Sequence, residues 1–150
     1  MSEQLKNFEK ATKIGEGAYG KVFSARHSVT GHMFALKKIY LQNDQEGIPS
    51  TTIREISLLK QIDHVNVLKL YDVINHNKRM YLVLDYCEKD LSKFSMDIDG
   101  ELNLIMLKRI IYQILKGVEE IHKKKILHRD IKPQNILVKN SRIVKLADFG

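Results

Sequence analysis

The first half of the chain alternates apolar and polar residues in short stretches that polar segments separate. Such alternation places the apolar side chains on one face of a β-strand, so each stretch predicts a half-buried strand. The predicted strands span residues 8–14, 23–26, 33–40, 67–74 and 80–86. A polar turn over residues 75–78 joins the last two, and the five together predict one antiparallel sheet.

Helical spacing of apolar residues replaces this alternation in two longer segments. Ile53, Ile56, Leu59 and Ile62 predict an amphipathic helix within residues 48–61. Residues 102–123 carry the broadest apolar stripe, which we expect to lie in the core. Its members are Leu104, Leu107, Ile111, Ile114, Leu115, Val118 and Ile121. A short helix over 91–96 and a hairpin of 135–138 with 143–146 complete an α+β pattern.

Composition is that of a globular protein, with 43% hydrophobic and 29% charged residues among 150. No apolar run is long enough to span a membrane, and the N-terminus lacks the apolar core of a secretory signal. The single cysteine, Cys87, excludes an internal disulfide and suits a reducing compartment. We therefore expect a protein of the cytoplasm, the nucleus or both, with no membrane partner.

The net charge of +7 raises the question of nucleic-acid binding. The densest basic run, 123–125, follows the long helical pattern and is best explained as a solvated helix end that the helix dipole favours. We expect no nucleic-acid partner. A basic surface that attracts ATP or an acidic partner is a milder interpretation of the same charge.

A glycine-rich motif, G-x-G-x-x-G-x-V, occupies residues 15–22. Glycines let a backbone approach phosphate oxygens closely, where a Cβ would intrude. The same pattern also occurs in Rossmann folds and in plain glycine-rich hairpins. A Rossmann unit needs a helix that begins inside the motif, whereas strand-forming residues 23–26 follow here. The motif therefore favours a phosphate-binding flap between two antiparallel strands.

The third predicted strand carries an Ala-Leu-Lys that resembles the V-A-I-K of protein kinases. Alternation places Ala35 and Lys37 on one face, where Ala35 leaves room for a base and Lys37 reaches phosphates; otherwise Lys37 is a plain surface charge. Glu55, on the following helix, can pair with Lys37. In the alternative, Thr52 and Glu55 form a capping box at the helix start. Pro49 favours an earlier start, which leaves Glu55 inside the helix and available to Lys37.

The stretch H-R-D-I-K-P-Q-N, residues 128–135, fits the pattern H-R-D-x-x-x-x-N. In this pattern an Asp, here Asp130, orients a hydroxyl nucleophile, and an Asn, here Asn135, holds a metal ion bound to a nucleotide phosphate. A D-F-G follows at 148–150, and the predicted hairpin delivers Asp148 next to Asn135. A turn with a coincidental H-R-D would not explain why the other motifs agree with it in order and spacing.

Residues 49–55, P-S-T-T-I-R-E, resemble the P-S-T-A-I-R-E helix of the cyclin-dependent protein kinases, the cell-division-cycle type of serine/threonine kinase, with Thr52 in place of alanine. With the motifs above, the resemblance covers nearly the whole chain. It implies an α+β, protein-kinase-like fold. Residues 1–86 would form an N-lobe with a five-stranded antiparallel sheet and one helix. Residues 87–150 would form the hinge and an incomplete helical C-lobe, because the family continues past this point with an activation segment, an A-P-E element and further helices.

The resemblance also implies a site for ATP and Mg²⁺. Asp130 would orient the substrate hydroxyl, Lys132 would neutralise the transferring phosphate, and Lys37 would be held by Glu55. Asn135 and Asp148 would bind the metal. The residues expected at the nucleotide are Ile14, Gly15, Glu16, Gly17, Ala18, Tyr19, Gly20, Lys21, Val22, Ala35, Lys37, Leu84, Asp85, Cys87, Asp90, Lys132, Gln134, Asn135, Leu137 and Asp148. Asp90 would contact the ribose, or else act as an N-cap for residues 91–96.

Two functions are carried forward from the resemblance. The first is a cyclin-dependent serine/threonine kinase, of which this chain is a fragment, acting on protein substrates in cell-cycle or related regulation. Its 49–55 helix would bind a cyclin-type subunit. The second is a non-catalytic truncated product that competes for the cyclin or for ATP. Tyr19 is a candidate for inhibitory phosphorylation, and Ala18 replaces the threonine that often precedes it in this family.

Overall fold

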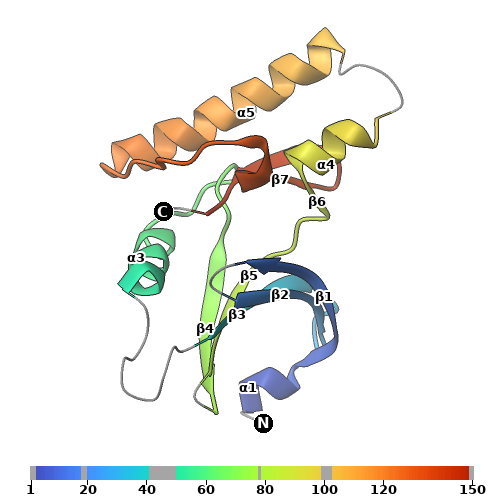
Figure 1. Cartoon of the computed structure of the whole chain (residues 1–150), viewed down its shortest axis with the longest axis vertical. Helices are drawn as coiled ribbons and strands as arrows, with labels where there is room; N and C mark the ends of the chain where they lie inside the picture. The colour runs from blue at the N-terminus through green and yellow to red at the C-terminus, as the bar shows by residue number, and fades with distance from the viewer. Residues whose placement is uncertain (1–2, 18–19, 41–49, 78, 99–102, 149–150) are drawn as a thin grey trace. The chain divides into compact units, whose positions relative to one another are not determined.

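The structure is a computed structural model that describes residues 3–17, 20–40, 50–77, 79–98 and 103–148. The chain divides into two compact units, whose elements are labelled in Figure 1. The first unit comprises Met1–Ile53 and Leu70–Tyr86, and the second comprises Arg54–Lys69 and Cys87–Gly150. Residues 54–69, which the predicted N-lobe includes, thus group with the second unit.

An antiparallel sheet of five strands forms the first unit, as predicted. Its strands are β1 (Phe8–Gly17), β2 (Gly20–His27), β3 (Met33–Tyr40), β4 (Leu70–His76) and β5 (Arg79–Asp85), after a short helix α1 (Glu3–Lys6). They run in the order β1-β2-β3-β5-β4, with every neighbouring pair antiparallel. β1 and β2 extend further toward each other than the apolar pattern indicated, because the glycines of the motif also pair across the two strands, Gly17 with Gly20.

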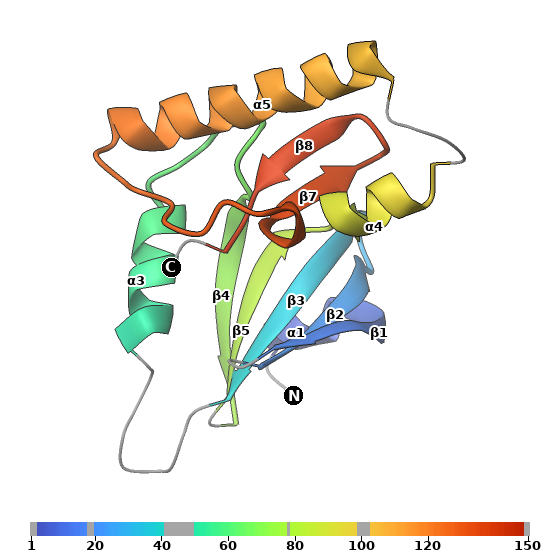
Figure 2. The same cartoon turned by 45° about the horizontal axis from the view of Figure 1, so that its top comes forward.

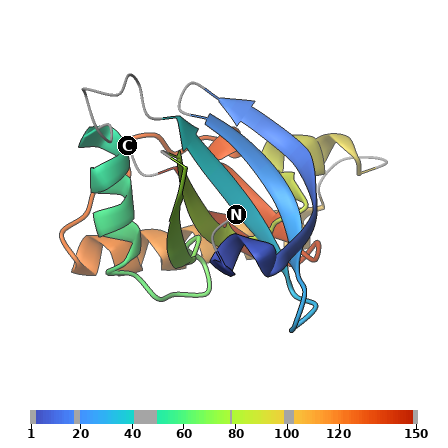
Figure 3. The same ribbon diagram turned by 90° about the horizontal axis from the view of Figure 1, so that it is seen from below.

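One face of this sheet carries a compact apolar cluster. Ala25, Leu36, Ile74 and Val83 are buried in it, and aromatic side chains pack around them. Leu5 of α1 packs against the same cluster, and Figure 3 shows this helix beside the sheet. The predicted alternation explains the arrangement, because these strand residues all point to one face.

The second unit is organised around a long helix and a hairpin. Its elements are the end of α3 (Ser50–Leu59), β6 (Lys89–Asp90), α4 (Leu91–Met96), α5 (Leu104–Lys123), a 3₁₀ turn η1 (Pro133–Asn135), β7 (Ile136–Lys139) and β8 (Ile143–Leu146). The three strands form a sheet in the order β6-β7-β8. Figure 2 shows α5 running along the β7–β8 hairpin. The predicted short helix and hairpin are both confirmed.

Helix α5 buries a different face from the predicted one. Its buried residues are Ile110, Gly117 and Ile121, of which the predicted stripe contained only Ile121. The stripe residues that are exposed are Leu104, Leu107, Ile111 and Leu115. The expectation that the stripe lies in the core is therefore met at Ile121 and not at these four residues, which form exposed apolar surface.

The reason lies in how closely the helix approaches its neighbours at Gly117. A Cβ at this position would lie 2.6 Å from the Asn66 carbonyl oxygen and 3.0 Å from Leu146 Cδ1. The helix therefore packs through its smallest residue, which a pattern of large apolar residues does not reveal. Among the described helices, none has the length and apolar character needed to cross a membrane.

Candidate functional site

Three side chains of the loop between α5 and β7 meet in one hydrogen-bonded cluster. Asp130 Oδ2 accepts hydrogen bonds from Lys132 Nζ at 2.6 Å and from Asn135 Nδ2 at 2.8 Å. Asn135 Nδ2 also donates to the backbone oxygen of Asp130 at 2.9 Å. Turn η1 brings these positions together: Pro133 begins it, and Asn135 N donates to Lys132 O at 2.9 Å.

The charges in this cluster favour an ionised carboxylate. The hydrogen bond from Lys132 is the main cause that lowers the pKa of Asp130, and the one from Asn135 adds to it. The side chains of Lys132 and Asp130 are 48% and 50% exposed, so a substrate can reach both. An ionised, accessible carboxylate only accepts hydrogen bonds, which is what orienting a hydroxyl group requires.

His128, the first residue of the H-R-D sequence, is buried beneath the loop and is only 2% exposed. Burial is the main cause that lowers the pKa of His128, against the effect of backbone hydrogen bonds, first among them one with Ala147. Its Nδ1 accepts a hydrogen bond from Asp130 N at 3.4 Å. A neutral, buried imidazole thus fixes the backbone that carries Asp130. Arg129 between them has φ 67°, an uncommon left-handed conformation.

The β7–β8 hairpin returns the chain to the same cluster. Ile136 pairs with Leu146, and Ala147 N then donates to Asn135 O at 2.9 Å. Asp148 therefore follows directly on a residue that is bonded to Asn135. Its φ of 64° is also left-handed. The expectation that the hairpin brings Asp148 to Asn135 is met by this backbone contact.

The oxygen atoms at this point fit Mg²⁺. Because Asn135 directs Nδ2 at Asp130, its Oδ1 remains as an acceptor, and the exposed Asp148 carboxylate adds an anionic oxygen. Mg²⁺ is commonly bound by one or two such oxygen ligands together with water and substrate phosphates. Within the described residues, no group of three or more His, Cys, Asp or Glu side chains is placed to hold a metal ion.

Two amide side chains that sequence reasoning missed hold the hairpin in place. Gln113 Oε1 accepts hydrogen bonds from Asn66 Nδ2 and Val144 N, both at 3.0 Å, and its Nε2 donates to Arg142 O at 3.0 Å. Asn66 Nδ2 also donates to Val144 O at 2.8 Å. A usable signal was present, since Gln113 is the polar residue at helical spacing between Ile110 and Gly117, where a polar group needs partners.

In the first unit, the glycine motif forms the facing ends of β1 and β2. Gly15 pairs with Val22, and Glu16 pairs with Lys21, whose Nζ lies 3.5 Å from Glu16 Oε1. The pKa of Glu16 is lowered, mainly by a hydrogen bond from Lys13. The two antiparallel strands that were predicted to flank the glycine motif are therefore present, one before and one after residues 18–19.

Gly20 has a structural role that the phosphate argument did not include. Its φ is 151°, and a Cβ there would lie 1.9 Å from the Lys38 carbonyl oxygen on β3. At Gly15, by contrast, the nearest atom to an added Cβ is Val22 Cβ at 3.8 Å, an ordinary contact. The last glycine of the motif is thus required by sheet packing, whatever binds to the loop.

The predicted nucleotide residues of the central strands lie on one face of the sheet. Lys37 pairs with Val22 and Ala35 pairs with Leu84, and residues two apart on a strand share a face. Ala35 and Leu84 are buried. This face is opposite the one that carries the apolar cluster of Leu36 and Val83.

Helix α3 begins at Ser50, so Thr52 and Glu55 both lie in its interior. The capping-box alternative is therefore wrong, because Thr52 is a buried helical residue and not the N-cap. Glu55 is half-buried within the helix. Its pairing with Lys37 stays a prediction, since the two residues belong to different units.

Asp85 and Asp90, both predicted at the nucleotide, have side chains that also serve the fold. Asp85 is buried, and its Oδ1 accepts a hydrogen bond from Tyr71 Oη at 3.2 Å. In the second unit, Asp90 is the N-cap of α4 and accepts from Lys93 N at 2.9 Å. The N-cap alternative for Asp90 is thus confirmed, and its contact with a ribose stays a prediction. Cys87 is half-buried.

The remaining predicted residues differ in exposure. Ile14 and Gln134 are exposed, whereas Leu137 is half-buried and pairs with Asp90 across β6 and β7. Ala18, Tyr19, Pro49 and the last two residues of the D-F-G lie outside the described residues. The inhibitory phosphorylation of Tyr19 therefore stays a prediction.

A family model for the protein kinase domain matches residues 8–150. The chain belongs to the protein kinase family. This assignment agrees with the five-stranded antiparallel sheet and with the hydrogen-bonded catalytic loop, and it confirms the predicted α+β, protein-kinase-like fold. Members of the family transfer phosphate from ATP to proteins, generally with Mg²⁺.

Proposed function

We propose that this chain acts as a cyclin-dependent serine/threonine kinase, in cell-cycle or related regulation in the cytoplasm or nucleus. The observation that carries the proposal is the cluster of Asp130, Lys132 and Asn135 around one carboxylate oxygen. Lys132, two positions after Asp130, matches the pattern that is typical of serine/threonine-specific members of the family. The P-S-T-T-I-R-E sequence of residues 49–55 supports the cyclin-dependent subfamily.

In the proposed reaction, Asp130 accepts a hydrogen bond from a Ser or Thr hydroxyl and directs its oxygen at the γ-phosphorus of ATP. A new O–P bond forms, the bond between the γ-phosphorus and the bridging oxygen breaks, and ADP leaves. The hydroxyl proton passes to the Asp130 carboxylate and then to solvent. Lys132, at 2.6 Å from that carboxylate, offsets negative charge on the phosphoryl group in transit.

The other proposed roles concern the nucleotide. Asn135 Oδ1 and the Asp148 carboxylate would hold Mg²⁺, which would offset the negative charge of the nucleotide's phosphates. Lys37, paired with Glu55, would contact the α- and β-phosphates. The glycine motif would cover the phosphates through its backbone, and Ala35 and Leu84 would border the base.

Phosphate transfer tests the catalytic part of this proposal. The assay combines the purified chain, a cyclin, Mg²⁺-ATP and a serine-proline peptide. Asp130→Asn removes the anionic acceptor, so we expect transfer to fall by about 10²–10⁴-fold while ATP binding stays nearly unchanged. Asp63→Asn is the matched control, because Asp63 is an exposed carboxylate paired with Lys69 at 3.0 Å.

Equal activity of Asp130→Asn and the unsubstituted chain would refute the catalytic assignment. If the unsubstituted chain binds ATP and cyclin but transfers no phosphate, the non-catalytic competitor becomes the better explanation. The assay therefore separates the two functions directly.

The cyclin contact is proposed for the exposed side of α3. Ile53, a large apolar residue on this side of the helix, is 51% exposed. Arg54 beside it is also exposed. Ile53→Asp should weaken cyclin binding in a titration, whereas Val29→Asp, which replaces an apolar residue that is 81% exposed outside α3, should not. Equal affinity of both variants would count against this surface.

A further inference from the structure

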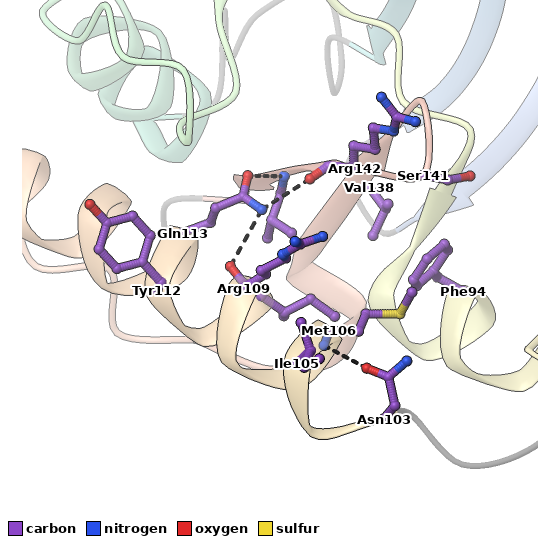
Figure 4. A pocket seen from close by; sticks show the side chains of 12 residues that line it. Phe94, Asn103, Ile105, Met106, Arg109, Tyr112, Gln113, Val138, Ser141 and Arg142 are labelled. Atoms are coloured by element: carbon purple, nitrogen blue, oxygen red, sulfur yellow. Dashed lines mark hydrogen bonds between the residues drawn. The ribbon is translucent and has the colours of Figure 1, made fainter.

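We propose that a groove in the second unit is a docking site for acidic protein segments that carry an apolar side chain. The groove is a cavity of about 500 Å³ formed by α4, the first half of α5 and the β7–β8 hairpin (Figure 4). None of its lining residues is a candidate for the phosphate-transfer site, so the inference does not depend on the proposed function.

The floor of the groove is apolar. Ile110, Val138 and Val144 line its bottom and are nearly fully buried, whereas Ile105 and Tyr112 of α5 are 66% and 62% exposed and provide accessible apolar surface. Phe94 of α4 and Met106 of α5 form one wall, and the Met106 side chain points toward the Phe94 ring in Figure 4. A thioether beside an aromatic ring adapts readily to apolar side chains of different shape. The floor therefore suits an aliphatic or aromatic anchor.

The rim of the groove is basic. Arg109 of α5 and Arg142 of the hairpin turn are both exposed, and the residues that line the groove include no Asp or Glu. Among the residues that the structure describes, neither guanidinium lies in a salt bridge with a carboxylate. Two cations beside an apolar floor complement a segment whose carboxylates flank an apolar residue.

The groove is held in shape before any partner arrives. Gln113 Nε2 donates to Arg142 O at 3.0 Å and to Arg109 O at 3.4 Å, as the dashed lines in Figure 4 show. Gln113 Oε1 accepts from Val144 N on the floor. One amide thus ties the backbone at both basic residues to the floor, so the backbone of the groove is ordered before binding.

A protein segment fits these features better than a nucleic acid does. Nucleic-acid affinity comes mainly from many phosphate contacts along a broad basic surface. Here two arginines border an apolar floor. The net charge of +7 would draw acidic partners in general, and the groove offers such a partner an apolar anchor point.

Fluorescence anisotropy tests the proposal with the purified chain and a labelled peptide in which glutamates flank two leucines. The double variant Arg109→Glu/Arg142→Glu should weaken binding by roughly tenfold or more at low salt, because it replaces attraction by repulsion at both rim positions. The control Lys60→Glu/Lys108→Glu makes the same charge change at exposed residues outside the groove, and its affinity should stay within about twofold. Replacing the two leucines by serines should also abolish tight binding.

Several results would overturn the proposal. One is an equal loss in the groove and control variants, which would indicate general charge attraction. Another is equal binding of a peptide with glutamines in place of glutamates. A third is a chain that self-associates in sedimentation experiments and becomes monomeric only in the groove variant, because the occupant would then be a second copy. If the charge reversal lowers the melting temperature, Arg109→Gln/Arg142→Gln repeats the test, and unchanged affinity in that folded variant would refute the basic rim.

Discussion

The replacement Gln113→Leu tests whether one side chain holds the β7–β8 hairpin, which lies between the candidate site residues Asn135 and Asp148 in the chain. Leucine has a similar size and favours a helix equally well, so the change removes hydrogen bonds with little effect on volume or helix propensity. The bonds lost are those from Asn66 Nδ2 and Val144 N to Oε1, and those from Nε2 to Arg142 O and Arg109 O.

The magnitude follows from which partners remain buried. Val144 is 2% exposed, so its N–H is left without an acceptor at a cost of about 1–3 kcal/mol. Asn66 Nδ2 keeps its bond to Val144 O at 2.8 Å, and water can reach Arg142 O on the exposed turn. Leucine at a half-buried site returns about 0.5–1 kcal/mol of hydrophobic free energy. We expect a net loss of about 1–2 kcal/mol, from the difference of these estimates.

Urea unfolding followed by far-UV circular dichroism measures this loss as a lower midpoint with an unchanged slope. Gln61→Leu is the matched control, because Gln61 is exposed and its side-chain amide donates to Ser57 O, at 2.9 Å, on the surface of the same helix end. That control should change the unfolding free energy by less than about 0.5 kcal/mol. A Gln113→Leu variant as stable as the control would refute the bracing role.

Three further predictions concern single positions. Gly20→Ala should destabilise the first unit by about 2 kcal/mol or more, since its Cβ would meet the Lys38 carbonyl at 1.9 Å, while Gly15→Ala should leave the melting temperature nearly unchanged. Lys132→Met should raise the pKa of Asp130 toward its ordinary value of 3.8, which a carbon-13 NMR titration measures. In the unsubstituted chain, the stability that the Asp130–Lys132 pair contributes is complete above pH 3.8. It is lost as the pH falls through the lowered pKa of the folded state. Because burial lowers the pKa of His128, this histidine binds a proton in the unfolded chain before it does in the folded one, so stability falls as the pH drops below about 6.5. His128→Phe should reduce this loss in denaturation curves between about pH 7.5 and 5.5. An unchanged loss would contradict the lowered pKa of His128.

Local patterns predicted the strands and the catalytic loop well because short-range chemistry determines both. Alternation specifies a strand such as β3 whatever it packs against. The turn that joins Asp130 to Asn135 spans only a few residues and begins at Pro133. For the same reason, the capping of α4 by Asp90 could be foreseen as an alternative, since it depends on a bond to Lys93 three positions later.

The buried face of α5 could not be predicted in this way, because it depends on residues distant in sequence. Gly117 faces the carbonyl of Asn66, and Gln113 bonds both to Asn66 and to the hairpin. A helical pattern ranks large apolar residues first and gives no weight to a glycine or a glutamine. The groove at Arg109 and Arg142 was missed similarly, since two separate basic residues form no motif.

The β7–β8 hairpin separates two parts of the chain that can change independently in evolution. Its base carries Asn135 and Ala147, which are bonded to each other, and its turn carries Arg142 on the rim of the groove. The four residues of β7 separate these ends by about 13 Å, at about 3.3 Å per residue. Substitutions or insertions in the turn could therefore change which proteins the proposed groove selects, while the proposed phosphate-transfer site at the base would be inherited intact.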